Sequence, residues 1–119
     1  MSLNIFYKSD FHEEQTNLIL NKFGLTNLFQ DVEYGVFAYI VGATYKAKDI
    51  VKAIDDEGTI DIDKLDSIIE FYSSSEKKMI EFALQLFNSR LSDIKLTHVM
   101  ESLDDENTKV IKQAVLIRY

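Results

Sequence analysis

The feature that most constrains the fold of this chain is its lack of residues that break helices. Its 119 residues contain no proline and only four glycines. Proline and glycine mark most turns and flexible linkers, whereas the abundant Leu, Ile, Lys, Glu and Asp suit helices joined by short polar turns. A chain of this length fits one domain, which can bury about two-thirds of the surface of the unfolded chain. We therefore expect a mainly α-helical protein with a single helical domain over residues 1–119.

The composition narrows the class of protein. Apolar residues make up 46% of the chain and charged residues 28%, which is typical of globular rather than disordered proteins. There is no cysteine, which excludes disulfides, thiolate metal sites and cysteine nucleophiles. The first residues lack the basic start and apolar run of a signal peptide, and no apolar stretch has the length of a membrane span. We expect a soluble, cytoplasmic protein.

Capping residues and apolar spacing predict the first helices. Asp10 is expected to cap a helix that ends at Gly24, and Asp31 to cap a second helix. The run 36–41 lies in this second element, and a buried strand is its alternative because short apolar runs do not reveal their period. Thr44 is the expected cap of a third helix. The inward-facing residues of the first helix are expected to be Phe11, Leu18, Ile19 and Phe23.

The second half of the chain contains the strongest helix signal. Apolar residues recur at spacings of three and four over 62–72, which predicts a short helix with an acidic outer face; a strand near Ile60 is the alternative. Ser73 and Glu76 have the spacing of a capping box, and two apolar stripes follow. We therefore expect the helix at 74–88 to be the central one of five or six short helices. A loop over 92–101 is expected before the last helix, whose first turn holds acids.

Negative charge is concentrated in one segment of the chain. The segment from Asp49 to Glu70 contains eight acids and only two lysines, so it accounts for six of the seven net negative charges of the chain. A field of this kind repels nucleic acid and attracts basic protein surfaces, so we expect no direct nucleic-acid binding. The candidate partner-binding residues are Asp55, Asp56, Glu57, Asp61, Asp63 and Asp66.

Two motifs suggest metal sites, and both fail at a required position. Aligning Gly58 with the sixth position of a calcium-binding EF-hand loop places Ala53 first and Lys64 twelfth, where a glutamate is needed. His12 begins a pattern like that of zinc peptidases, but Thr16 stands where the second histidine is required. No glycine pattern of a nucleophile elbow or a phosphate-binding loop is present. We expect no catalytic residue, no metal and no cofactor.

Several stretches from Asp31 onward carry a family resemblance. They are Asp31-Val32-Glu33, Val36-Phe37-Ala38-Tyr39-Ile40, Ser74-Ser75-Glu76, Phe82-Ala83-Leu84-Gln85-Leu86-Phe87-Asn88 and Leu103-Asp104-Asp105-Glu106-Asn107. In these stretches the chain is similar to an uncharacterised family of small proteins of Gram-positive bacteria and their phages. The resemblance implies a helical architecture and a phage or mobile-element setting, and it transfers no activity. Gly42-Ala43-Thr44 departs from the glycine–asparagine end typical of the family's second element.

These observations favour a non-enzymatic function. We expect an acidic accessory module that binds another protein with a basic surface. In the phage setting that the resemblance implies, this module would inhibit a host defence or nucleic-acid enzyme, its acidic segment imitating phosphate charge. The alternative is a small structural protein that self-associates through apolar helix faces, and an enzyme is the third hypothesis.

Overall fold

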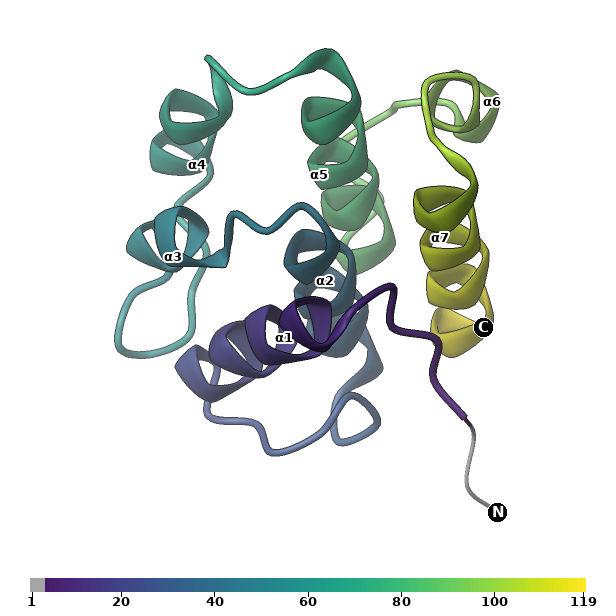
Figure 1. Cartoon of the computed structure of the whole chain (residues 1–119). Coiled ribbons are helices and arrows are strands. Elements are labelled where there is room, and N and C mark those ends of the chain that lie inside the picture. Colours follow the sequence, from purple (N-terminus) through teal and green to yellow (C-terminus); the bar gives the residue numbers. More distant parts are fainter. Residues whose placement is uncertain (1–3) are drawn as a thin grey trace.

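The computed structural model describes residues 4–119, and its regular elements are helices apart from one isolated β-bridge (Figure 1). The helices are α1 (Asp10–Lys22), α2 (Val32–Ala43), α3 (Ala47–Ile50), the 3-10 helix η1 (Val51–Ala53), α4 (Ile62–Ile69), α5 (Ser74–Phe87), α6 (Leu96–Met100) and α7 (Asp105–Arg118). The expected mainly helical fold is confirmed. The described residues contain seven α-helices rather than five or six, since part of the expected loop over 92–101 forms α6.

Local capping bonds fix the starts of three helices, and the sequence predicts the first two of these caps. The carboxylate of Asp31 accepts hydrogen bonds from the first-turn amides of α2. Ser73 and Glu76 form the complete capping box at the start of α5. Asp104 caps α7 and accepts from the amide of Asn107 at 2.8 Å. These bonds satisfy amides that have no partner within the helix, so they act independently of the tertiary fold.

Two predicted caps are wrong. Ser9, not Asp10, caps α1, because its hydroxyl accepts from the amide of His12 at 3.0 Å. The hydroxyl of Thr44 instead donates to the carbonyl of Val41 at 2.6 Å and so closes the end of α2. The next helix begins only at Ala47, whose amide donates to the buried side chain of Gln15 in α1 at 3.0 Å. A side chain from another helix thus replaces the expected local cap.

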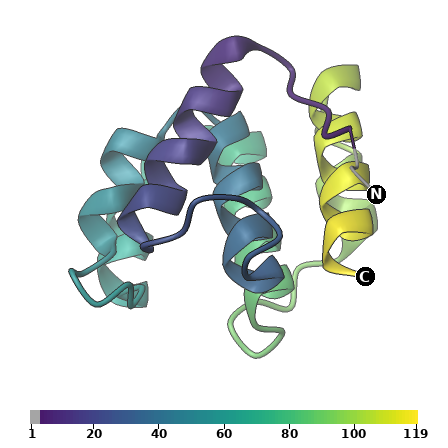
Figure 2. The ribbon, with the colours of Figure 1, turned by 90° about the horizontal axis from the view of Figure 1, so that it is seen from below.

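The central element is α2 rather than the expected helix at 74–88. Every residue of α2 from Gly35 to Ala43 is buried, and α2 packs against α1, α5 and α7. Figures 1 and 2 show α2 between α1 and α7. Because α2 is apolar on all sides, it must be covered on all sides, whereas α5 keeps a partly exposed polar strip. The alternative of a strand at 36–41 is excluded.

Over residues 4–119, no helix has both the length and the apolarity that crossing a membrane requires.

The helices α1 and α2 approach each other closely at Gly42. A Cβ atom added there would lie 2.8 Å from the backbone nitrogen of Thr16 and would also overlap its hydroxyl. The face of α1 that packs there is partly polar, and it buries His12, Gln15 and Thr16 beside Ile19 and Leu20. The expected inward positions of Phe11 and Leu18 are wrong, since these side chains are 46% and 36% exposed.

Candidate functional site

The six predicted partner-binding acids lie on one side of the molecule. Three belong to the turn that follows η1, and three belong to the start and first turns of α4. All six are exposed. Figure 1 shows this turn and α4 together with α3, on the side of the fold opposite to α7. We call Asp55, Asp56, Glu57, Asp61, Asp63 and Asp66 the acidic surface.

Half of the acidic surface also has a structural role, which the sequence analysis did not foresee. The carboxylate of Asp55 accepts from the amides of Glu57 and Thr59, both at 2.9 Å, and closes the turn. Asp61 caps α4 by accepting from an amide at 3.1 Å. Asp56 forms an exposed ion pair with Lys22 at 3.2 Å.

The other three carboxylates of the acidic surface have no such role. Within residues 4–119, those of Glu57, Asp63 and Asp66 accept no hydrogen bond and form no ion pair. Their charge is therefore fully available to solvent or to a partner.

The turn itself is shaped by the backbone. Gly58 has a φ of +81°, a conformation that side-chain-bearing residues rarely adopt. Ile54 and Ile60 form an isolated antiparallel β-bridge across the turn. Among the described residues, no group of three or more His, Cys, Asp or Glu side chains is placed to hold a metal ion.

An exposed aromatic side chain follows α4, the helix that carries part of the acidic surface. Phe71 is 89% exposed, directly after Glu70 at the end of α4. Its neighbour Tyr72 is anchored, because its hydroxyl donates to the carboxylate of Asp49 at 3.0 Å. Burial, together with this hydrogen bond, raises the pKa of Tyr72. The spacing of apolar residues in this segment already leaves Phe71 off the buried face, a signal that the sequence analysis did not use.

A second surface feature is an apolar hollow between α6 and α7. It has a volume of about 300 Å³, and its lining residues are Leu96, Met100, Ile111, Lys112, Val115 and Leu116. Leu96 is 46% exposed and Leu116 is 72% exposed. Sequence reasoning missed this hollow because it assigned α6 to a loop.

A third surface feature is an open groove of about 690 Å³ beside α1. One wall is the segment that precedes α1, with Asn4, Ile5 and Tyr7; the opposite wall is the loop after α1, with Asn27 and Phe29. Most of its other lining residues come from α1. No pattern in the sequence indicated this groove, since its walls come from three separate segments.

His12 is fully buried at the junction of α1, α2 and the segment before α1. Its Nε2 lies 2.8 Å from the carbonyl oxygen of Tyr39, and its Nδ1 accepts from the amide of Lys8 at 3.2 Å. The ring packs against Tyr7 and Tyr39, with ring centroids 5.0 and 4.9 Å away. Burial lowers the pKa of His12 to about 4; the bond to the Tyr39 carbonyl opposes this shift and Lys8 adds to it. Sequence reasoning considered His12 only as a zinc ligand.

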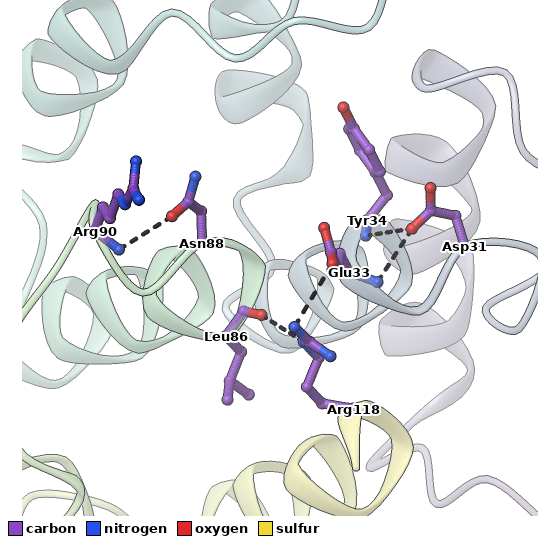
Figure 3. Close-up of polar contacts among 7 residues, drawn as sticks. All are labelled: Asp31, Glu33, Tyr34, Leu86, Asn88, Arg90 and Arg118. Atoms are coloured by element: carbon purple, nitrogen blue, oxygen red, sulfur yellow. Dashed lines mark hydrogen bonds and ion pairs between the residues drawn. The ribbon is translucent and has the colours of Figure 1, made fainter.

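The C-terminal end of α7 is tied to two other helices through Arg118 (Figure 3). Its Nε donates to the carbonyl of Leu86 at 2.9 Å, and its Nη2 lies 3.6 Å from a carboxylate oxygen of Glu33. Leu86 is near the end of α5, and Glu33 is in the first turn of α2, next to the cap at Asp31. These contacts hold the ends of α2, α5 and α7 together and assign Arg118 a structural role.

In comparisons with known proteins, no family model, no curated protein and no solved structure matches this chain. The candidate site is therefore defined by geometry alone, as the acidic surface with Phe71 beside it in the chain.

Proposed function

We propose that this chain is a non-enzymatic protein-binding module whose acidic surface binds a partner with a basic surface. The observation that carries the proposal is that all six acids are exposed on folded elements rather than on a disordered tail. Fixed charges of one sign accelerate association with a surface of the opposite sign and make it sensitive to salt.

Phe71 supports the proposal because interfaces need more than charge. Binding energy is concentrated in a few aromatic or arginine anchors, whereas charged residues at the rim mainly set association rate and specificity. Phe71 is almost fully exposed next to the acidic helix, and the bond from Tyr72 to Asp49 fixes the chain beside it. A basic partner surface with an apolar pocket matches this arrangement.

The resemblance to small proteins of Gram-positive bacteria and their phages gives the proposal a concrete form. In that form the partner is a host defence or nucleic-acid enzyme, and the acidic surface occupies its phosphate-binding groove. The alternative proposal is a self-associating structural protein, and the observation that favours it is the exposed apolar hollow between α6 and α7.

The test compares three tagged proteins in affinity capture from the native host, with mass spectrometry of what elutes along a salt gradient. The first is the wild type. The acidic-surface variant combines Asp55→Asn, Asp56→Asn, Asp61→Asn and Asp63→Asn. Asparagine keeps the side-chain oxygen that the turn and the α4 cap use, so this variant should fold.

The third protein is the matched control variant, which removes the same charge elsewhere on the exposed surface. It combines Glu14→Gln, Asp93→Asn, Glu101→Gln and Asp105→Asn. We expect the wild type and the control to capture the same protein, and the acidic-surface variant to lose it or to release it at lower salt. Capture of the same partner by all three at the same salt concentration would refute the proposal.

A single substitution tests the anchor separately from the charge. Phe71→Ser should weaken capture at every salt concentration while leaving the salt dependence itself unchanged. If Leu116→Ser abolishes capture of the partner and Phe71→Ser does not, the interface is the hollow between α6 and α7 rather than the acidic surface.

A further inference from the structure

The described chain begins with a strap that joins the start of α1 to α7. Residues 4–8, the N-terminal strap, run from the start of α1 across α2 to α7 (Figures 1 and 2). The amide of Phe6 donates to the side chain of Gln113 at 3.2 Å, and the hydroxyl of Tyr39 donates to the carbonyl of Phe6. The ammonium group of Lys8 donates to Asn107 at 3.0 Å. The strap is thus attached to α2 and α7 by these polar contacts and by the packing of Ile5, Phe6 and Tyr7 against the core.

The strap is also bonded to His12, and this bond fixes which ring nitrogen carries the proton. The backbone amide of Lys8 can only donate, so Nδ1 must accept. The carbonyl of Tyr39 can only accept, so Nε2 must donate. Only the neutral ring with its proton on Nε2 satisfies both bonds. The two backbone partners therefore select one of the three protonation states of the ring.

Protonation of His12 is incompatible with this arrangement. A second proton on Nδ1 would point at the Lys8 amide and convert a hydrogen bond into a contact between two donors. The charged and titratable groups around the ring offer no compensation, since the strap contributes Tyr7 and Lys8 and α2 contributes Tyr39. The acid next to His12 in the sequence, Glu13, is exposed at the surface.

We propose that His12 is a proton-sensitive latch: protonation of Nδ1 releases the N-terminal strap while the helices stay folded, and the release removes one wall of the groove beside α1. The helices can stay folded because every fully buried core residue lies after the strap, whereas Ile5, Phe6 and Tyr7 keep part of their surface exposed and pack against the outside of that core. The groove loses its wall because Asn4, Ile5 and Tyr7 belong to the strap.

The pH range of release follows from the two states of the latch. The pKa of His12 is about 4 in the closed state and returns toward its ordinary value of 6.5 once the strap is released. The open state therefore binds more protons between these values, and the opening constant rises by about 10-fold for each pH unit below 6.5. The change ends at about pH 4, below which both states are protonated.

The test follows the wild-type protein by NMR between pH 7 and pH 4.5, with hydrogen exchange expressed as protection factors. At pH 7, two-bond nitrogen–proton correlations should show His12 neutral with its proton on Nε2. On acidification, the protection of the Phe6 and Lys8 amides should fall by about 100-fold over two pH units. The core amides of α2 and α7 should keep their protection over the same range.

Two variants separate the latch from other histidine effects. His12→Asn cannot titrate but keeps a side-chain oxygen able to accept from the Lys8 amide, so its strap protection should be independent of pH over this range. His98→Asn removes the only other histidine, which is exposed in α6, and should leave the response of the wild type intact.

Two results with the wild type alone would overturn the proposal, whether or not His12→Asn folds. One is strap protection that changes less than twofold between pH 7 and pH 4.5. The other is loss of strap and core protection together, which would show that acid unfolds the whole domain rather than opening the strap.

Discussion

The close contact between α1 and α2 predicts that Gly42→Ala destabilises the protein even though alanine favours helix. In a helix interior, alanine is better than glycine by about 1 kcal/mol. Here the new Cβ would lie 2.8 Å from the nitrogen and 3.0 Å from the Cα of Thr16. These are backbone atoms in the middle of α1, so the two helices must move apart to accept the methyl group.

The expected magnitude is the balance of these two effects. Overpacking of a well-packed core costs about 1–3 kcal/mol, and a backbone contact places Gly42→Ala at the upper end of that range. Subtracting the helix preference leaves a net destabilisation of about 2 kcal/mol. Since each kcal/mol shifts the Tm of a domain of this size by about 4 °C, the Tm should fall by about 8 °C.

The assay is thermal and denaturant unfolding of four proteins followed by circular dichroism. Gly24→Ala is the control for conformational strain without a clash, because Gly24 has a φ of +78° and no atom within 4 Å of an added Cβ. The double variant Thr16→Ala/Gly42→Ala removes the overlap with the hydroxyl but not that with the backbone, so it should relieve only part of the loss caused by Gly42→Ala. An unchanged or raised Tm for Gly42→Ala would refute the close approach of α1 and α2.

Three further predictions concern other parts of the molecule. Arg118→Met keeps the aliphatic stem but loses the hydrogen bond to a carbonyl of α5, so the free energy of unfolding should fall by about 1–2 kcal/mol, whereas Arg90→Met in the exposed loop should have no effect. Burial raises the pKa of Tyr7 to about 12 and also raises that of Tyr39, so stability should be lost as the pH rises above the unfolded value of 10.0, and less steeply in Tyr39→Phe. Millimolar calcium should leave the Tm unchanged, because Lys64 occupies the position where an EF-hand loop needs a bidentate glutamate; a saturable rise in Tm would contradict this prediction.

The parts of the fold that the sequence predicts correctly are those set by nearby residues. Asp31 bonds to an amide within three residues, and the Ser73–Glu76 box closes over the same distance. Such bonds need no knowledge of the tertiary structure. Thr44 shows the limit, because the helix after it is capped by Gln15, which lies 32 residues away in the sequence.

The sequence did not reveal the central position of α2, because its apolar residues do not mark one face of the helix as the buried face. An apolar stripe shows which face of a helix is buried, but a segment that is apolar all round is compatible with a strand or with a helix covered on every side. The stripes of α5 made it the more recognisable helix, whereas the lack of a polar face in α2 was the evidence that it lies at the centre.

Some features of the candidate site can be predicted from the sequence, and others depend on the tertiary fold. The charge of the acidic surface follows directly from the sequence, and its exposure follows from the apolar spacing of α4. The structural roles of Asp55 and Asp61 depend on where the turn closes, which the sequence did not settle. His12 is buried by Lys8 and by Tyr39, which is 27 residues away, so no local pattern reveals its environment.

The burial of α2 from Gly35 to Ala43 has a consequence for how the chain is made. During synthesis α1 and α2 leave the ribosome before α5 and α7, the helices that cover the other faces of α2. Until then the uncharged segment Val36–Val41, rich in β-branched and aromatic residues, is exposed in a form prone to pair with other chains. Slow translation or truncation before residue 105 should therefore favour aggregation of this protein, because α2 stays partly uncovered until α7 has been synthesised.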